Sequence, residues 1–151
     1  MTVEKAEAGE MQALKQWADR EFEQYEARQG VAYQLKPFAF AAREAGEILG
    51  VIRGFTCFAE AYIEDLAVAG HCRAKGIGRQ LMQAAEAYCR AQNVENLNLC
   101  TYGFQAPGFY EALGFTLEFI RKSRNSQLDK YYYVKYFDPH EGAEQALQAQ
   151  G

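Results

Sequence analysis

Apolar residues recur at helical spacing in two segments of the chain. Over residues 10 to 28 they stand three or four positions apart, while four carboxylates occupy the opposite face. In the second segment one apolar stripe contains Ile77, Leu81, Ala84 and Tyr88. Both patterns predict amphipathic helices.

Short apolar or alternating runs between and after these segments predict strands. Residues 37–44 and 48–60 flank a polar, glycine-containing turn and are expected to form a hairpin. A short helix is expected over 106–113. The other predicted strands cover residues 2–6, 61–68, 97–101, 115–123 and 130–137. This order of elements predicts an α/β fold, a mixed sheet with helices on both faces.

The length of 151 residues fits a single domain over 1–151, with a polar, peripheral tail over 138–151. No run approaches the roughly 20 apolar residues that a membrane helix needs. The N-terminus lacks the basic and then apolar pattern of a secretion signal. We therefore expect a cytoplasmic protein without a membrane partner.

Charge and cysteine usage narrow the range of partners. The net charge of −4 argues against a large nucleic-acid interface. The four cysteines are spread along the chain without a CxxC pair, and only two histidines are present. We expect reduced thiols and no metal site.

The turn before the second helix carries the most specific chemistry. Residues 73–79 read RAKGIGR, in which two glycines stand among three cationic side chains. Glycines let a backbone approach a ligand closely, and the first N–H groups of a helix attract anions. The turn is thus either a phosphate site or a solvated loop. It lacks the third glycine of a dinucleotide fingerprint and the lysine-threonine ending of a P-loop, so NAD and ATP are disfavoured.

Two motifs together resemble the GNAT superfamily of N-acetyltransferases. The run Arg73-Ala74-Lys75-Gly76-Ile77-Gly78 matches the family's R/Q-x-x-G-x-G/A motif between a strand and a helix. Residues 109–115, FYEALGF, match its second signature at the expected distance. The resemblance implies the GNAT-like acyl-CoA N-acyltransferase fold, a central, twisted, mostly antiparallel sheet. It also implies an acetyl-CoA-dependent N-acetyltransferase that transfers acetyl directly to a primary amine.

The resemblance implies two CoA-binding segments. Backbone amides of residues 74–79 would cradle the pyrophosphate, and the cations beside them would supply charge to it or to the 3′-phosphate. Residues 66–68 would pair with the pantetheine arm, and the Leu66 N–H would polarise the thioester carbonyl. The expected cofactor-binding residues are Leu66, Ala67, Val68, Arg73, Ala74, Lys75, Gly76, Ile77, Gly78, Arg79 and Gln105.

Two residues are the catalytic candidates. Tyr110 matches the family's tyrosine beside the sulfur and is the expected acid for the leaving thiolate. Glu64 precedes the thioester-binding strand segment and is the expected base, acting through water. A relay of water alone is the alternative, because some relatives use one. By alternation Glu64 and Asp65 are expected on opposite faces of the strand.

Gly103 departs from the family, because it stands where many members have a CoA-contacting asparagine; Gln105 is the expected substitute. The acidic first helix favours a small cationic amine as acceptor, or is simply a solvated face. A protein lysine or N-terminal acetyltransferase and a catalytically silent CoA-binding module are the alternative functions. A homodimer also stays open.

Overall fold

The computed structural model describes residues 1–32, 34–105 and 107–137. It divides into two compact units, Met1–Gln34 and Leu35–Gly151, and each is described by itself. The single domain expected over 1–151 stays a prediction, and the expected tail lies outside the described residues.

The first unit contains a short 3-10 turn, η1 (Ala8–Glu10), and one helix, α1 (Met11–Arg28). The helix confirms the prediction for residues 10–28. The strand predicted over residues 2–6 is wrong, because residues 1–7 have no regular structure. A strand is stabilised by hydrogen bonds to a neighbouring strand, and the described residues of this unit form none.

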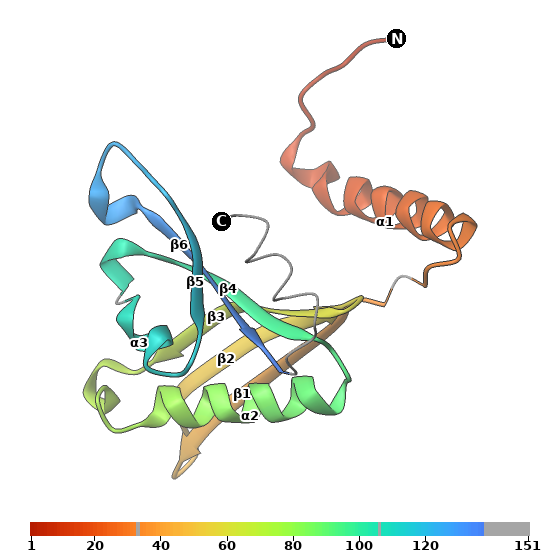
Figure 1. Cartoon of the computed structure of the whole chain (residues 1–151). Helices are drawn as coiled ribbons and strands as arrows, with labels where there is room; N and C mark the ends of the chain where they lie inside the picture. The colour runs from red at the N-terminus through yellow and green to blue at the C-terminus, as the bar shows by residue number, and fades with distance from the viewer. Residues whose placement is uncertain (33, 106, 138–151) are drawn as a thin grey trace, which may run out of the picture. The chain divides into compact units, whose positions relative to one another are not determined.

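The second unit is built on one six-stranded sheet in the order β1-β2-β3-β4-β6-β5 (Figure 1). All neighbouring strands are antiparallel except β3 and β4, which are parallel. This confirms the expected mixed, mostly antiparallel sheet. The strands are β1 (Lys36–Glu44), β2 (Glu47–Cys57), β3 (Glu60–Val68), β4 (Asn96–Tyr102), β5 (Thr116–Arg121) and β6 (Lys130–Tyr136).

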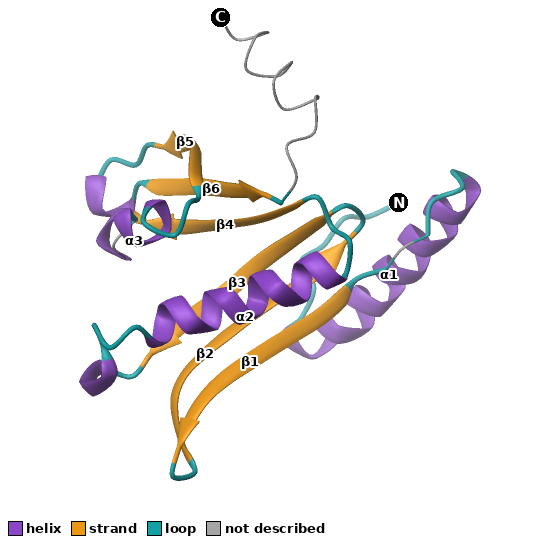
Figure 2. Cartoon of the chain, turned by 60° about the horizontal axis from the view of Figure 1, so that its bottom comes forward, coloured by secondary structure: helices purple, strands orange, loops and turns teal. Residues whose placement is uncertain are grey.

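The sheet opens in its middle, between β3 and β4. Only three pairs join the two strands, from Glu60↔Asn96 to Tyr62↔Asn98. Beyond Tyr62 the strands diverge, which Figure 2 shows as the separation of β4 from β3. The outer half of β3 therefore has a strand partner on its β2 side alone.

One long helix, α2 (Ile77–Ala91), packs against β1, β2 and β3. A second, very short helix, α3 (Gly108–Glu111), precedes β5. The core between helices and sheet is apolar, and its largest fully buried side chains are Tyr133, Ile52, Met82, Leu97 and Cys89. The helix expected on the opposite face of the sheet stays a prediction, because α1 belongs to the other unit.

None of the four cysteines, all of which lie in the described ranges, forms a disulfide bond, and Cys72 and Cys89 are buried. Among the described residues, the helices are too short or too polar to span a bilayer.

Candidate active site

The turn between β3 and α2 exposes the start of a helix. Gly76 occupies the N-cap position with φ +80°, a left-handed conformation that glycine adopts without strain. No side chain caps this end, and the first intrahelical bond runs from the Gln80 N–H to the Gly76 carbonyl at 3.0 Å. The amides of Ile77, Gly78 and Arg79 therefore have no acceptor within the helix. Amides in this position are suited to bind an anion.

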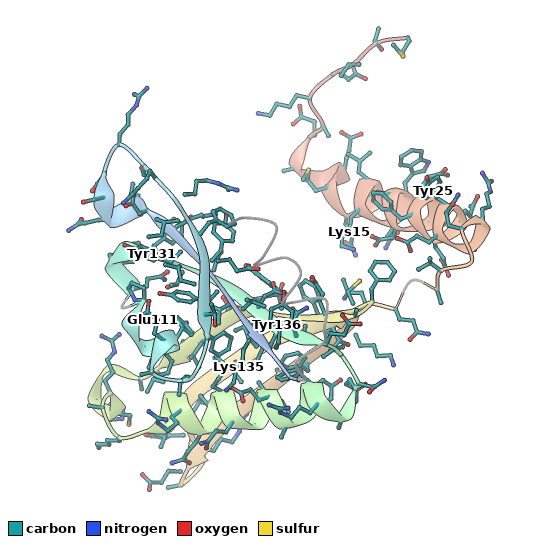
Figure 3. The ribbon with its side chains drawn as sticks, viewed as in Figure 1. Lys15, Tyr25, Glu111, Tyr131, Lys135 and Tyr136 are labelled. Atoms are coloured by element: carbon teal, nitrogen blue, oxygen red, sulfur yellow. The ribbon has the colours of Figure 1, made fainter. Side chains whose placement is uncertain are left out.

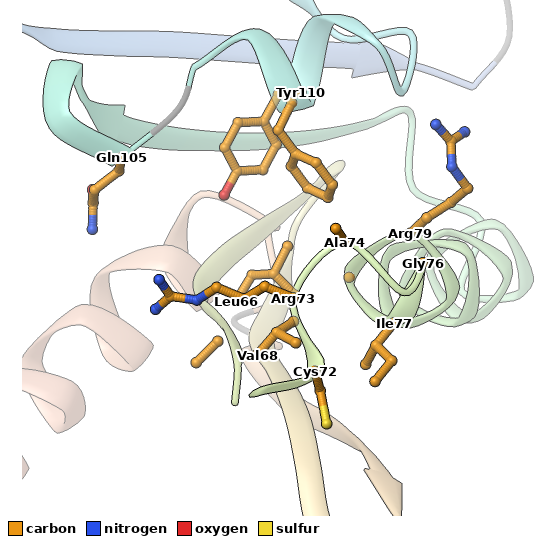
Figure 4. A pocket seen from close by; sticks show the side chains of 13 residues that line it. Leu66, Val68, Cys72, Arg73, Ala74, Gly76, Ile77, Arg79, Gln105 and Tyr110 are labelled. Atoms are coloured by element: carbon orange, nitrogen blue, oxygen red, sulfur yellow. The ribbon is translucent and has the colours of Figure 1, made fainter. Parts of the chain in front are cut away.

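A cavity of about 690 Å³ lies over this turn. Its walls come from the outer half of β3, from the turn and first residues of α2, and from the segment that carries α3 (Figure 4). The Tyr110 ring enters from α3, across from Leu66 and Val68 of β3. One cavity thus joins an anion-binding turn, an apolar strand wall and a phenol.

The cavity brings together most of the residues that the sequence singled out. Tyr110 lines it, whereas Lys75 does not. Ten of the eleven expected cofactor-binding residues line it: Leu66, Ala67, Val68, Arg73, Ala74, Gly76, Ile77, Gly78, Arg79 and Gln105.

Two lining residues, Cys72 and Phe109, were not among the expected cofactor-binding or catalytic residues. Phe109 packs closely on the first turn of α2, since a Cβ added to Gly78 would lie 3.3 Å from its Cζ. The signal for this contact was present, because Phe109 belongs to the FYEALGF motif and a glycine inside a helix marks a close approach. Cys72 is buried directly before Arg73, and its place in the sequence already put it near the expected CoA path, although no role was assigned to it.

Tyr110 is half-buried among aromatic rings. Its ring centroid lies 5.2 Å from that of Phe109, 6.0 Å from Phe115 and 5.9 Å from Tyr133. Burial raises the pKa of the Tyr110 hydroxyl, and the nearby Cys100 raises it further. The phenol therefore stays protonated at neutral pH and is available as a proton donor.

Glu64 does not line this cavity. It is exposed and lines a smaller hollow of about 330 Å³ that also contains Arg53. The expected alternation of Glu64 and Asp65 is interrupted by a bulge, because Arg53 pairs with Asp65 while Gly54 pairs with Ile63. Asp65 forms an ion pair with Arg53, through a hydrogen bond of 2.7 Å from Nε and a second one from the terminal nitrogen.

The segment after β4 explains the departure at Gly103. A Cβ at this position would lie 2.8 Å from the Ser126 carbonyl oxygen, so an asparagine does not fit. Gln105 lines the cavity instead, and its side-chain oxygen accepts the Tyr102 N–H at 3.0 Å. Its amide nitrogen is the remaining donor for a ligand.

Charge and shape at this cavity fit a ligand that has phosphates at one end and an extended arm. The unpaired helix amides, Arg73 and Arg79 match the phosphates, and the half-paired β3 matches the arm. Among the described residues, no group of three or more His, Cys, Asp and Glu side chains is placed to hold a metal ion.

Comparison with known proteins gives a matching family model, a curated relative and similar solved structures. The family model "Acetyltransferase (GNAT) family" matches residues 7–115. Blasticidin-S acetyltransferase of Streptomyces morookaense is 33% identical over 79 residues, which cover 52% of this chain and 58% of that protein. The chain thus spans a little over half the length of this curated relative.

Solved structures share the fold. A crystal structure of an acetyltransferase from Bacillus cereus ATCC 14579 has a TM-score of 0.76 at 20% identity and covers 91% of this chain and 98% of that one. An aminoglycoside 6′-N-acetyltransferase complexed with coenzyme A has a TM-score of 0.59 at 17% identity, over 69% of this chain and 74% of that one. At these identities the likeness concerns the fold alone.

Proposed function

We propose that this chain, which belongs to the acetyltransferase (GNAT) family, transfers an acetyl group from acetyl-CoA to a primary amine of a small molecule. In this reaction a C–N bond forms at the thioester carbonyl, the C–S bond breaks, and the amine's proton is lost as the thiolate gains one. The observation that carries the proposal is the cavity that joins the amides of α2 to the Tyr110 hydroxyl.

The phosphate end of this site is the turn before α2. The amides of Ile77, Gly78 and Arg79 hold the pyrophosphate, and the helix dipole adds partial positive charge there. Arg73 and Arg79 add full charges at the cavity wall. Lys75 does not line the cavity. We therefore assign to it only a longer-range electrostatic attraction for the 3′-phosphate.

The strand wall orients the arm of the cosubstrate. Residues 66–68 of β3 have no strand partner on the β4 side, so their backbone can pair with an extended ligand. We assign to the Leu66 N–H the hydrogen bond that polarises the thioester carbonyl oxygen.

Tyr110 supplies the proton that the departing thiolate requires. Its raised pKa keeps the hydroxyl protonated at neutral pH, and the hydroxyl faces the cavity. Glu64 stays the candidate base through water, because it lies two residues before Leu66 at the bulge of β3. Its exposure leaves a relay of water alone as the alternative.

A small-molecule acceptor is supported by the name of one relative, a blasticidin-S acetyltransferase that is 33% identical over its matched region.

Calorimetry and a panel of amines test the proposal together. We expect CoA to bind with a Kd between about 1 µM and 1 mM, and acetyl-CoA with an accepted amine to release free thiol. Tyr110→Phe is expected to lower kcat by about 10- to 1000-fold with little change in CoA affinity. Absence of CoA binding would overturn the proposal. CoA binding without thiol release from any amine would instead favour a binding module, and acetylated lysines on co-expressed proteins would favour a protein substrate.

A further inference from the structure

The helix that carries Tyr110 is too short to hold its own orientation. α3 spans four residues, and no side chain caps its N-terminus. A single helical turn is unstable in isolation, because nucleation fixes several residues for few hydrogen bonds. The direction of the Tyr110 hydroxyl must therefore be set by contacts outside α3.

Lys135 of β6 provides one such contact, beneath the residues that follow Tyr110. Its ammonium nitrogen donates to the Leu113 carbonyl oxygen at 2.8 Å and to the two carboxylate oxygens of Glu86 at 2.8 and 2.9 Å. An ammonium group has three N–H donors, and three acceptor atoms surround it here. The side chains of Lys135 and Glu86 are only 23% and 15% exposed.

Tyr133, two residues earlier on β6, provides a second contact. Because side chains two apart on a strand share a face, Tyr133 and Lys135 both point toward the helices. The Tyr133 hydroxyl donates to Glu111 Oε1 at 2.9 Å, and its ring packs beside that of Tyr110. Tyr133 is fully buried. Figure 3 labels Glu111 and Lys135 in this region.

These contacts link the Tyr110 segment to α2 at two points. Phe109, before Tyr110, packs on Gly78 in the first turn of α2. Leu113, after Tyr110, is joined through Lys135 to Glu86, farther along the same helix. Tyr110 lies between these two contacts. Its position is therefore fixed relative to α2, whose first amides form the anion site.

We propose that Lys135 is a positioning residue for the acetyl transfer. It binds the Leu113 carbonyl and Glu86 together and thereby fixes the Tyr110 hydroxyl relative to the start of α2. This inference rests on the proposed function, in which Tyr110 is the acid. Lys135 itself does not line the cavity, so it acts through Tyr110.

Kinetics of Lys135→Met and Lys135→Arg test the role of Lys135. Methionine keeps much of the length of the side chain but donates no hydrogen bond, whereas arginine keeps the charge and the pairing with Glu86. We expect Lys135→Met to lower kcat about 10-fold, because a small misplacement of a catalytic group costs rates of this order. CoA affinity by calorimetry and the KM for the amine should stay within about 3-fold, and Lys135→Arg should recover most of kcat.

A double-mutant cycle separates positioning from a general loss of stability. If Lys135 acts through Tyr110, Tyr110→Phe should cost at least about 3-fold less in kcat when combined with Lys135→Met than alone. All variants are assayed well below their melting temperatures. Lys36→Met, at an exposed residue on β1, is the matched control and should match the parent. Additive effects on kcat, or an unchanged kcat in Lys135→Met, would overturn the inference.

A spectroscopic arm decides the positioning without any activity. With 3-fluorotyrosine at position 110, the fluorine NMR titration should shift to lower pH in Lys135→Met, because a released phenol becomes solvated. A titration that coincides with that of the parent would contradict the inference. If Lys135→Met does not fold, Tyr133→Phe is used instead, because it removes only the hydroxyl that donates to Glu111. It should lower kcat and shift the fluorine NMR titration to lower pH, as expected for Lys135→Met. A parent that acetylates no amine would overturn the proposed function, while this titration would still decide the positioning.

Discussion

At the residue scale, Gly78 is the position where the two sequence motifs meet. Its missing side chain leaves room for Phe109, whose Cζ would lie 3.3 Å from an added Cβ. The Val68 side chain lies 3.7 Å from the same point. At 3.3 Å the Phe109 ring must move by a few tenths of an ångström to admit a methyl group. A branched side chain requires a larger displacement of the ring.

We expect Gly78→Val to weaken CoA binding by about 10-fold or more, because displacing Phe109 also moves the amides proposed to bind phosphate. Gly78→Ala should change the Kd by less than about 3-fold, since better helix propensity offsets part of the strain. Calorimetric titration with CoA measures both. Gly70→Val is the control, as no atom lies within 4 Å of a Cβ built there. Equal Kd values for Gly78→Val and the parent would contradict this account.

Individual site residues were predictable where the turn itself defines them. Gly76 and Tyr110 were singled out by motif, and both line the cavity. Side chains that depend on a distant packing partner were not predictable in the same way. Phe109 was missed, and Lys75 was predicted although it does not line the cavity. A motif specifies the backbone path of a turn and not the direction of each side chain. The position of Glu64 depends on a bulge that the residue pattern did not predict.

At the scale of elements, the connection between β5 and β6 is fastened by one buried carboxylate. Asp129 accepts a hydrogen bond from Lys122 Nζ at 2.8 Å and one from the Ser123 N–H at 2.8 Å. Its backbone carbonyl accepts the Gly103 N–H at 2.9 Å. The connection is thus attached to the segment that carries Gln105. These hydrogen bonds hold the pKa of Asp129 below its usual value, and the one from Lys122 has the larger effect.

This lowered pKa makes a prediction for stability in acid. The stabilisation from Asp129 is present above its unfolded pKa of about 3.9 and is lost as pH falls through the lower folded pKa. Asp129→Asn should therefore melt at a lower temperature than the parent at pH 6, and the difference should shrink below about pH 4. Melting curves by circular dichroism from pH 7 to pH 2 measure this. Asp19→Asn, which removes a carboxylate paired with Lys15 on α1, is the control. A constant difference between Asp129→Asn and the parent would exclude this role.

The periodicity of the chain predicted the main helices and strands, because each of them buries a face with a regular spacing. Both long helices and the hairpin of β1 and β2 were found as expected. The strand expected over 2–6 failed because a short alternating segment does not reveal whether a partner strand exists. The register of β3 against β2, with its bulge, also depends on contacts between segments and not on either segment alone.

For the whole molecule, the relevant contrast is between an acidic chain and a cationic site. The net charge is −4, yet Arg73 and Arg79 both line the cavity. Their attraction for phosphate acts over a partly exposed surface, where dissolved ions screen it. The rest of the chain does not supply a compensating positive field.

CoA affinity should therefore fall as salt rises. Between about 0.05 and 0.5 M NaCl we expect the Kd to increase several-fold, as the Debye length shortens from roughly 14 to 4 Å. The double variant Arg73→Gln, Arg79→Gln should bind more weakly at low salt and lose most of this dependence. Arg124→Gln, in the connection between β5 and β6, is the control. Calorimetry at the two salt concentrations gives the comparison, and an equal salt dependence in parent and double variant would refute the assignment.

The opening between β3 and β4 gives the sheet a pair of internal edges in addition to its two outer ones. The unpaired N–H and C=O groups of β3 along this opening are a template for any extended chain, including a peptide or another copy of the protein. A cosubstrate bound there, as proposed, would close the sheet, and its binding would then also protect the protein from strand-mediated aggregation. In amide hydrogen exchange, this closure would appear as slowed exchange in the outer half of β3. The inner half, already hydrogen-bonded to both neighbours, would hardly change.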